Sequence, residues 1–517
     1  MDVQVLSDVK LNIDQSEKEL ERLAEKRLKC KPAYFRIRKK SLDARDKNNL
    51  HYVYTIEFSK TPIAKIEKTY DVLPKNKQPE NKVLVVGSGP AGLFCALRLL
   101  DHGIQPIVIE RGDRVEERTK KINLFSTERV LDVNSNVQFG EGGAGTFSDG
   151  KLNTQTHSPY NRDVLETFVK YGAPEEILWL NKPHIGSDKL RSVVKNMRED
   201  IQNRGGEIRF RTKLEDVKTV GGKAVSVLLK DTLTGECVDL GVQDVVLAIG
   251  HSARDTFEML LSKGVVIRQK DFAVGVRIEH LQSMVGLSQY GKNYFKLPAA
   301  DYKLVSHAGD RAAFTFCMCP GGYVMPAASE EGCVVVNGMS NYARDGRNAN
   351  SALIVPITGK DFGSDKPLAG IEFQRKIEQA AFIAGGKTYA APTQLVGDFL
   401  NDRVSSEFKE VQPTYAAGTA FADLREVLPP FIIEALKCGL TDLDRKLHGF
   451  AGESAILTGV ESRTSSPVRI ERGEDMQSVS VVGLYPCGEG AGYAGGITSS
   501  AADGLRVAEA LFQKLFQ

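Results

Sequence analysis

Residues 82–92 read KVLVVGSGPAG, and this stretch constrains the fold of the chain more than any other. A β-branched run leads into Gly87, Gly89 and Gly92, and LFCALRLLDHG follows, so the pattern predicts a strand, a tight turn and a helix. The first glycine allows the turn, the second lets the backbone approach a phosphate, and the third lets the helix pack closely on the strand. Free N–H groups at the helix start would then favour a bound anion.

The next segment supplies a second strand and an acid. IQPIVIER ends in Glu110 and Arg111, and Glu110 stands 23 residues after Gly87, where its carboxylate is expected to accept hydrogen bonds from a ribose. The order of strand, turn, helix, strand and acid predicts a dinucleotide-binding unit, with Pro90 and Ala91 in its turn.

Two distant segments indicate which dinucleotide binds. Residues 481–511 predict a strand, a turn at Gly488 and Glu489, and a helix that opens near Gly495, Gly496 and Ile497. The helix start would face the pyrimidine edge of a flavin and stabilise negative charge on the reduced ring. A third segment, DVVLAIGHSARD, ends a strand at a turn formed by Ala248, Ile249 and Gly250. One extended ligand between these segments favours FAD over NAD.

Six further motifs carry a family resemblance, and they are spread over nearly the whole chain: QFGEGGAGTFSDGKLNT (138–154), FAVGVRIEH (272–280), FCMCPGGYV (316–324), NGMSNYARDGRNANSALIV (337–355), ESRTSSPVRI (461–470) and CGEGAGYAGGI (487–497). The chain resembles the glutathione reductase-type FAD superfamily. It is more closely similar to a set of bacterial FAD-dependent dehydrogenases, often labelled NAD(P)/FAD-dependent oxidoreductases.

The resemblance implies FAD binding and assigns residues to it. It gives the ADP half of FAD to Gly87, Gly89, Gly92, Glu110 and Arg111, and the adenine to Val217. It gives the pyrophosphate and flavin to Gly142, Gly143, Thr146 and Phe147, and the flavin side to Gly488, Glu489, Gly496 and Ile497. Relatives commonly have Asp where this chain has Glu489, so the ribityl contact is expected to differ.

The chain is too long for one ordinary core, and we expect an α/β protein of several domains. Residues 1–72 form a small basic module and 73–81 a linker. A discontinuous Rossmann-type FAD-binding domain takes 82–155, 184–270 and 446–517, and an inserted α+β substrate or cap domain takes 271–445.

The N-terminal module is predicted to have a β-α-β-β order, with Asp14 and Glu17 as a capping box for a helix that runs to about Leu28. Residues 1–80 hold 18 Lys and Arg against 13 Asp and Glu. The surplus indicates a solvated hairpin face, or alternatively a docking surface for an acidic protein partner or RNA.

Composition excludes several classes. The formal charge of +2 predicts no strong attraction to nucleic acid or membrane, and eight cysteines are too few for a disulfide framework in 517 residues. We expect a cytoplasmic protein with no signal peptide, no membrane span and no metal site.

The chain has no second strand–GxGxxG–helix unit, so NAD(P)H, if it is the electron donor, must bind transiently in the substrate cleft. The late aspartate-alanine-alanine-histidine signature of aromatic hydroxylases is also missing, which disfavours a monooxygenase by analogy.

Cys317 and Cys319, in FTFCMCPGGYVMP, are separated by one residue, whereas a flavin-linked dithiol usually has two. A disulfide would need a distorted backbone. We expect the thiols to be directed apart and to pack as small apolar side chains. The alternatives are one substrate-facing thiol, or a disulfide or metal site.

Candidate substrate-binding residues are Arg463 and Lys151, the two that we assign to catalysis, together with Asn337, Asn341 and Arg344. Arg463 could bind a substrate carboxylate or stabilise reduced flavin, although loop residues of this kind more often only solvate or hydrogen-bond the loop. We expect an FAD-dependent oxidoreductase acting on a small molecule. The alternatives are an RNA-modifying flavoprotein that uses the basic module, and a non-catalytic flavin-binding partner protein.

Overall fold

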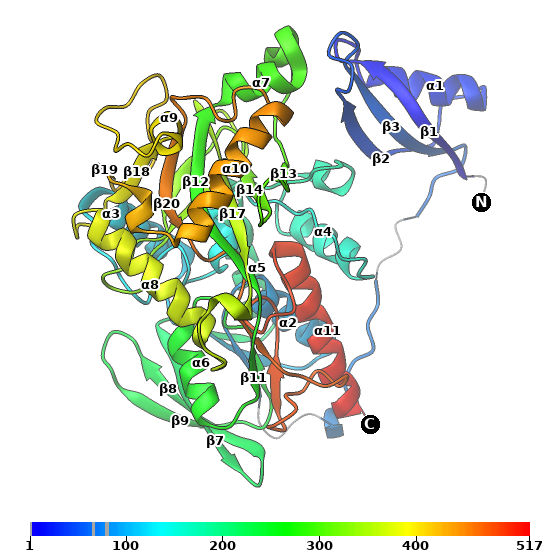
Figure 1. Ribbon diagram of the computed structural model, residues 1–517. Helices are drawn as coiled ribbons and strands as arrows, with labels where there is room; N and C mark the ends of the chain where they lie inside the picture. Colours follow the sequence, from blue (N-terminus) through cyan, green and yellow to red (C-terminus); the bar gives the residue numbers. More distant parts are fainter. Residues whose placement is uncertain (1–2, 65–67, 78–81, 517) are drawn as a thin grey trace.

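The computed structural model describes residues 3–64, 68–77 and 82–516, which form a small N-terminal module and a larger body with two main sheets (Figure 1). The module contains β1 (Val3–Asn12), α1 (Lys18–Leu28), β2 (Tyr34–Asp43) and β3 (His51–Ser59), in the order that the sequence predicts. Its antiparallel sheet has the order β1-β3-β2. Leu20, Ala24 and Leu28 of α1 are buried in one cluster with residues of β3.

The predicted capping box of α1 is wrong. The helix begins at Lys18, and no side chain caps it. Glu17 instead accepts hydrogen bonds from Lys40 Nζ at 2.6 Å and Tyr54 Oη at 3.0 Å, so its carboxylate ties the helix start to the sheet.

The segment that follows the module contacts the larger body before residue 72, where the module was predicted to end. The last strand of the module ends at Ser59, and among residues 68–77 Lys68 pairs with Asp163 and Glu166, while Leu73 is buried. Residues 78–81 of the predicted linker lie outside the described residues. The module itself contacts the body through β2, since the Lys40 N–H donates to the Trp179 carbonyl at 2.8 Å.

The first sheet of the body is fully parallel, with the order β22-β10-β4-β5-β6. Its strands are β4 (Val83–Val86), β5 (Pro106–Ile109), β6 (Glu207–Arg209), β10 (Val245–Leu247) and β22 (Leu484–Pro486). Short apolar strands such as VLVV and PIVI are buried on both faces, as a parallel sheet with two covered faces requires.

Helices cover one face of this sheet and a β-meander covers the other. The helices that share a core with it are α2 (Pro90–Asp101), α4 (Asn161–Lys170), α5 (Ser187–Asn203) and α11 (Ile497–Phe516). The other face packs on β7 (Thr212–Val220) and β8 (Lys223–Asp231), which continue into β9 (Cys237–Gly241), and on α6 (Arg254–Ser262). Helix α3 (Val115–Glu128) follows β5. Residues 161–170 therefore belong to this domain, although the predicted segments leave them out.

The second sheet has the order β13-β14-β17-β12-β20-β18-β19. Its strands are β12 (Phe272–Leu281), β13 (Val305–Ser306), β14 (Ala313–Cys319), β17 (Asn348–Ile357), β18 (Ala391–Leu395), β19 (Thr419–Phe421) and β20 (Ile456–Glu461). Helices α8 (Ala369–Ala384) and α10 (Pro430–Lys446) cover one face. The remaining elements are α7 (Gln282–Tyr290), α9 (Val396–Leu400) and two strand pairs, β15 (Tyr323–Pro326) with β16 (Val336–Met339) and β11 (Ile267–Gln269) with β21 (Val468–Ile470).

The alternation along β12 gives the second sheet one apolar and one polar face. Val274, Val276 and Ile278 point into the core under α8 and α10, whereas Arg277 and Glu279 point to the opposite side and are fully buried there. This polar face forms part of the site described below.

The predicted boundary at residue 446 is wrong for one strand. Residues 456–461 form β20, which pairs with β12 and β18 inside the second sheet rather than joining the parallel sheet. The chain returns to the first domain only after β20.

Within the described ranges of the chain, no helix combines the length and the apolar character needed to cross a bilayer.

Candidate functional site

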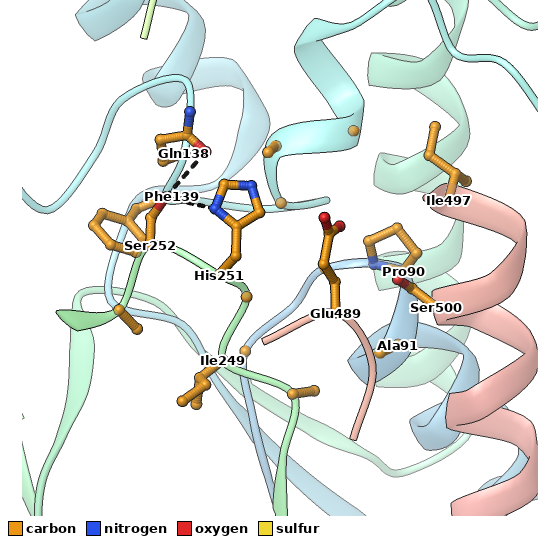
Figure 2. Close-up of a pocket in the computed structure, with 18 of the residues that line it drawn as sticks. Pro90, Ala91, Gln138, Phe139, Ile249, His251, Ser252, Glu489, Ile497 and Ser500 are labelled. Carbon is orange, nitrogen blue, oxygen red and sulfur yellow. Dashed lines mark hydrogen bonds between the residues drawn. The ribbon is translucent and has the colours of Figure 1, made fainter. Parts of the chain in front are cut away.

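A cavity of about 350 Å³ lies at the carboxyl ends of the central parallel strands, where the second sheet meets them. The loops after β4, β5 and β10, the loop before α11, and residues of β14 and β20 all contribute to its wall. Crevices at the carboxyl ends of parallel strands are the usual ligand sites of such sheets. Figure 2 shows part of the wall, where Pro90 and Ala91 of α2 lie opposite Ile249 and His251.

The three glycines of the first turn have different surroundings. Gly87 has φ +101°, and a Cβ there would lie 2.3 Å from the Ala248 carbonyl oxygen. A Cβ at Gly92 would lie 1.9 Å from the Gly87 oxygen, so Gly92 serves helix-to-strand packing and does not line the cavity. Gly89 does line it, and the nearest atom to a Cβ there would be Gly143 Cα at 3.7 Å. The turn is therefore tight on the protein side and open on the cavity side.

Glu110 lines the cavity, but its carboxylate is already used by the protein. Oε2 accepts hydrogen bonds from the Ser88 N–H at 3.0 Å and from Ser88 Oγ at 2.9 Å. Oε1 accepts from the N–H groups of Gly112 and Gly140, both at 3.0 Å. In this arrangement Glu110 holds three loops together, and a ribose hydroxyl would have to share or replace these bonds.

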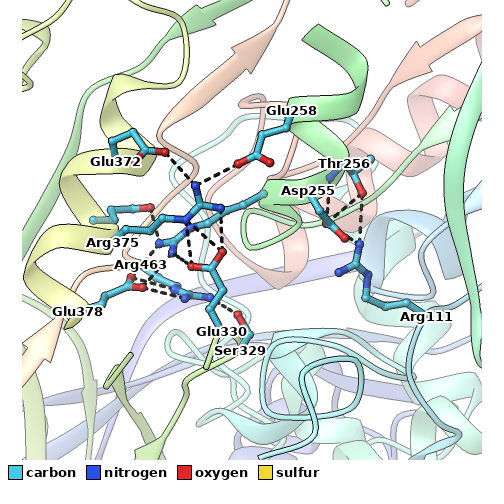
Figure 3. Close-up of polar contacts among 12 residues, drawn as sticks. Arg111, Asp255, Thr256, Glu258, Ser329, Glu330, Glu372, Arg375, Glu378 and Arg463 are labelled. Carbon is cyan, nitrogen blue, oxygen red and sulfur yellow. Dashed lines mark hydrogen bonds and ion pairs between the residues drawn. The ribbon is translucent and has the colours of Figure 1, made fainter. Parts of the chain in front are cut away.

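Arg111, beside it, is held at the same end of the cavity. Its Nη2 donates to Asp255 Oδ1 at 2.7 Å (Figure 3). Its guanidinium also lies 4.4 Å from the centroid of the Phe139 ring. Both contacts fix the side chain along the wall.

The structure brings most of the predicted cofactor residues into this wall: Gly87, Gly89, Pro90, Ala91, Glu110, Arg111, Gly143, Ala248, Gly250, Glu489, Gly495, Gly496 and Ile497. It does not bring in Gly92, Gly142, Thr146, Phe147, Val217 or Gly488. Val217 is buried in the core under β7, and Thr212, Lys213 and Leu214 at the start of that strand line the cavity instead.

The other residues outside the wall have packing roles. Phe147 is buried with the Arg118 guanidinium 4.8 Å from its ring, and a Cβ at Gly142 would meet Thr146 Oγ1 at 2.0 Å. The Gly488 N–H donates to Asp503 Oδ2 at 2.8 Å, which fixes the turn before the C-terminal loop.

That loop presents open glycines and one acid to the cavity. A Cβ at Gly495 or Gly496 would meet no described atom within 4 Å. Burial raises the pKa of Glu489 to about 7, although Lys270 counteracts part of the effect. Figure 2 shows the Glu489 carboxylate between His251 and Pro90, with Ile497 at the start of α11 on the far side.

Lys151 lies in the wall with a partly satisfied charge. Its Nζ is 3.6 Å from Asp149 Oδ2 and has no hydrogen-bond partner among the described residues. Asp149 also pairs with Arg344, so Arg344 serves this carboxylate and does not line the cavity. Asn337 lines it, but Asn341 does not.

Arg463 reaches the wall, but its guanidinium is committed to other protein groups. Nε and Nη2 donate to the two oxygens of Glu378 at 3.1 and 3.0 Å, and Nη1 donates to Ser329 Oγ (Figure 3). Arg254 of α6 binds the same carboxylate from the other domain. Arg254 is therefore the residue that joins the two domains at Glu378, and Arg463, whose donors Glu378 and Ser329 occupy, is less suited to the catalytic role expected of it.

A second acid, Glu330, lies close to this cluster. Atoms of Glu330, Cys333 and Glu378 lie within 4.8 Å of one another, a spacing that a metal ion could use. Glu330, however, pairs with Arg254 and Arg375, and the charge of Glu378 is balanced by Arg254 and Arg463. The arginines already compensate both carboxylates without an ion.

Sequence reasoning missed a number of residues of the wall, among them the polar side chains Gln138, His251, Ser252 and Glu461. Ser252 Oγ donates to Gln138 Oε1 at 3.3 Å and lies 3.0 Å from His251 Nδ1. Burial, with the Arg463 and Arg254 charges, lowers the pKa of His251 to about 3, so the ring is neutral at pH 7. A signal existed for His251 and Ser252, since both directly follow the predicted turn at Gly250.

The expectation that Cys317 and Cys319 are directed apart is wrong. Residues two apart in a strand share a face, and a β-bulge between Phe316 and Cys319 bends the strand at this point. Cys319 Sγ donates to the Cys317 carbonyl oxygen at 3.3 Å, and the two thiols are close enough to shift each other's pKa. Cys317 lines the cavity, whereas Cys319 is buried behind it.

The residues present fit an FAD molecule. Two glycine turns, at Gly89 and at Gly495 and Gly496, leave open space on the cavity side, as a backbone that approaches a pyrophosphate or a flavin edge requires. The starts of α2 and α11 both face the same cavity. A parallel sheet with this pair of turns is the architecture of dinucleotide-binding flavoproteins.

Comparison with known families agrees with this class. The family model "FAD binding domain" matches residues 80–132, and "FAD-dependent protein, C-terminal domain-like" matches residues 271–464. A domain of unknown function, DUF8436, matches residues 3–59. An uncharacterized protein of Clostridium beijerinckii is 47% identical over 496 residues, which cover 92% of each chain. The chain belongs to the same family as this clostridial protein, a family of FAD-dependent proteins.

Several solved structures match the chain at low sequence identity. The flavin-dependent brominase Bmp2 is 13% identical over 84% of this chain and 79% of its own, with a TM-score of 0.37. Glycerol-3-phosphate dehydrogenase from Bacillus halodurans, in complex with FAD, is 16% identical over 85% and 66%, with a TM-score of 0.34. A geranylgeranyl bacteriochlorophyll reductase-like protein from Thermoplasma acidophilum is 12% identical over 84% and 80%, with a TM-score of 0.36.

Proposed function

We propose that the chain is an FAD-dependent oxidoreductase that acts on a small molecule in the cavity between its two domains. The observation that carries this proposal is that two open glycine turns and a wall of ionisable residues from the second sheet enclose one cavity. When bound there, FAD would supply hydride transfer through its N5 atom.

The chain's own residues would place the two halves of the cofactor. Gly87, Gly89 and the N–H groups at the start of α2 hold the pyrophosphate, while Arg111 and the start of β7 lie along the ADP half. Gly495 and Gly496 let the flavin edge approach the start of α11, whose dipole favours negative charge on the reduced ring.

The substrate side would be formed by the second domain. Cys317, Asn337 and Glu461 line the cavity there, and Lys151 of the first domain lines it as well. The Lys151 ammonium has unused donors, so it is the residue that we assign to binding a substrate anion. Arg463 is a positioning residue in this scheme, because Glu378 and Ser329 occupy its donors.

NAD(P)H is our candidate electron donor, binding transiently in the same cavity. The sequence contains only one strand–GxGxxG–helix unit, and FAD would occupy it. NAD(P)H would therefore bind without a dinucleotide-binding domain of its own. Anaerobic mixing of the purified protein with NADH and with NADPH tests this donor. Bleaching of the flavin absorbance by either one is expected, and bleaching only by another class of reductant would exclude the nicotinamides.

The basic N-terminal module gives no support to an RNA substrate. Arg36 and Arg38 of β2 both pair with Glu57, at 3.3 and 3.2 Å, and Lys40 pairs with Glu17 at 2.6 Å. These charges are partly compensated within the module. A protein partner at this module stays a prediction, and a gel shift of the full chain with mixed RNA is expected to show no specific band.

Identification of the cofactor tests the proposal. The purified protein, reconstituted with FAD if necessary, is heat-denatured, and the released molecule is identified by chromatography and mass spectrometry. Noncovalent FAD is expected, with a flavin spectrum that photoreduction bleaches. Released NAD, or no flavin retained after reconstitution, would refute the proposed function.

A further inference from the structure

The wall that the second sheet contributes to the cavity contains a pair of cysteines held in an irregular strand. Cys317 has φ +42°, a left-handed conformation that residues with a side chain rarely adopt, and it stands in the bulge of β14. Backbone outliers of this kind cluster at functional sites because the surrounding structure must enforce them. The bulge turns the Cys317 thiol toward the cavity while Cys319 stays buried beside it.

A buried arginine enforces this conformation. Arg277 of β12 is fully buried, and its Nη2 donates to the Cys317 carbonyl oxygen at 2.6 Å and lies 3.7 Å from Cys319 Sγ. Its Nη1 pairs with Glu461 Oε2 at 3.1 Å, and its Nε donates to Asn350 Oδ1 at 2.9 Å. One guanidinium therefore fixes the backbone of the first cysteine and lies against the sulfur of the second.

The cavity side of the pair is also cationic. Lys151 lines the same cavity, and its buried ammonium lacks a hydrogen-bond partner among the described residues. The adjacent Cys319 thiol, together with the charges of Lys151 and Arg277, lowers the pKa of the Cys317 thiol. A thiolate next to a second thiol, with cations around it, is the arrangement in which cysteines exchange electrons.

We propose that Cys317 and Cys319 form a redox pair that cycles between dithiol and disulfide and exchanges two electrons with the flavin of the same cavity. The electron exchange rests on the proposed function, whereas disulfide formation does not. Oxidation of the thiolate–thiol pair breaks the Cys319 S–H bond, forms one S–S bond, and releases one proton and two electrons. FAD bound in the cavity would accept that proton and those two electrons, so the exchange balances in either direction.

The single intervening residue, which argued against a disulfide, is consistent with this role. A disulfide closed over one residue is strained, and strained disulfides are reduced more readily than structural ones. Such a bond is suited to repeated opening rather than to holding the fold.

The first test measures the disulfide without reference to flavin. The full chain is oxidised with diamide, and the free thiols that remain are alkylated and mapped by mass spectrometry. The wild type and Cys333→Ala, a buried cysteine outside the pair, are expected to lose two alkylatable thiols at positions 317 and 319. Cys317→Ser and Cys319→Ser are expected to lose neither remaining thiol. Full alkylation of Cys317 and Cys319 in oxidised wild type would overturn the proposal.

The second test measures the coupling to flavin in the holoprotein. After oxidation, an anaerobic dithionite titration is expected to need about four electrons per FAD in the wild type and in Cys333→Ala, but about two in either Ser variant. About two electrons in all four proteins would refute the exchange with flavin. A third outcome is that the disulfide forms but the chain does not retain FAD. That result would refute the proposed function and the electron exchange with flavin, and only the part of the proposal that concerns disulfide formation would stand.

Discussion

Arg254 of α6 and Glu378 of α8 form a two-point ion pair across the boundary between the two domains. Arg254 Nη1 lies 2.9 Å from Glu378 Oε2, and Nη2 lies 2.8 Å from Oε1. Both side chains are buried, and Arg463 binds the same carboxylate. Burial alone would raise the pKa of Glu378, but the two guanidinium groups lower it to about 2.

Glu378→Gln should therefore destabilise the folded protein strongly. It leaves the buried Arg463 guanidinium without a counter-charge and Arg254 with Glu330 alone, and loss of one partner from a buried pair costs about 3–5 kcal/mol. Glu372→Gln, which removes an exposed partner of Arg375 in the same helix, should cost at most about 1 kcal/mol. Thermal unfolding of the three proteins measures the difference, and equal melting temperatures would contradict the role given to the cluster.

Glu489→Gln should stabilise flavin-free protein in a pH-dependent way. The folded pKa of Glu489 is raised to about 7, against about 4.3 in an unfolded chain. Protonated Glu489 makes its full contribution to the free energy of unfolding below about pH 4.3, and this contribution is lost as the pH rises through about 7. Gln resembles protonated Glu in shape and is uncharged at every pH. The melting temperature of the variant should therefore match that of the wild type near pH 4.5 and lie several degrees above it at pH 8.

The exposed Glu474→Gln serves as the control for this measurement. It should show no such divergence between the two pH values. A difference between Glu489→Gln and wild type that is the same at both pH values would show that Glu489 does not titrate as described.

Lys151→Gln should slow the alkylation of Cys317 by iodoacetamide at pH 7. The groups that act on the Cys317 thiol are Cys319, Lys151, Arg277 and Glu461, and of these Lys151 is the cation that lines the cavity. Its removal raises the thiol pKa and lowers the thiolate fraction, so a decrease of about three- to tenfold is expected in flavin-free protein. At a pH above the pKa of the Cys317 thiol in both proteins, the thiol is ionised in each, and the alkylation rates of wild type and Lys151→Gln should converge.

Lys182→Gln, which changes an exposed lysine outside the cavity, provides the comparison for that experiment. The alkylation rate of Cys317 in this variant should equal that of the wild type. Equal rates in Lys151→Gln and wild type at pH 7 would show that Lys151 does not act on the thiol.

The parts of the fold that the sequence predicts well depend on local signals. The turn at Gly87 and Gly89 follows a strand and precedes a helix within a few residues, and the same holds for Gly495 and Gly496 before α11. Strand β20 was assigned to the wrong domain because its partners β12 and β18 lie far away in the sequence.

The side-chain roles were harder to predict because they depend on distant partners. Arg463 is engaged by Glu378, 85 residues earlier in the chain, and a loop sequence gives no sign of that contact. The bulge at Cys317 depends on Arg277 of another strand. Val217, predicted to contact the adenine, does not line the cavity, because its side chain packs into the core under β7.

Binding of FAD by a Gly89 variant tests the central claim most directly. Gly89 lines the cavity at the predicted phosphate position, and a branched side chain there would occupy that space. Gly241 has open surroundings on β9, outside the cavity, so Gly241→Val is the matched control. Titration of flavin-free protein with FAD, followed by ultrafiltration, should show full occupancy in wild type and Gly241→Val and almost none in Gly89→Val. Wild-type occupancy in folded Gly89→Val would contradict the assignment of this cavity to FAD.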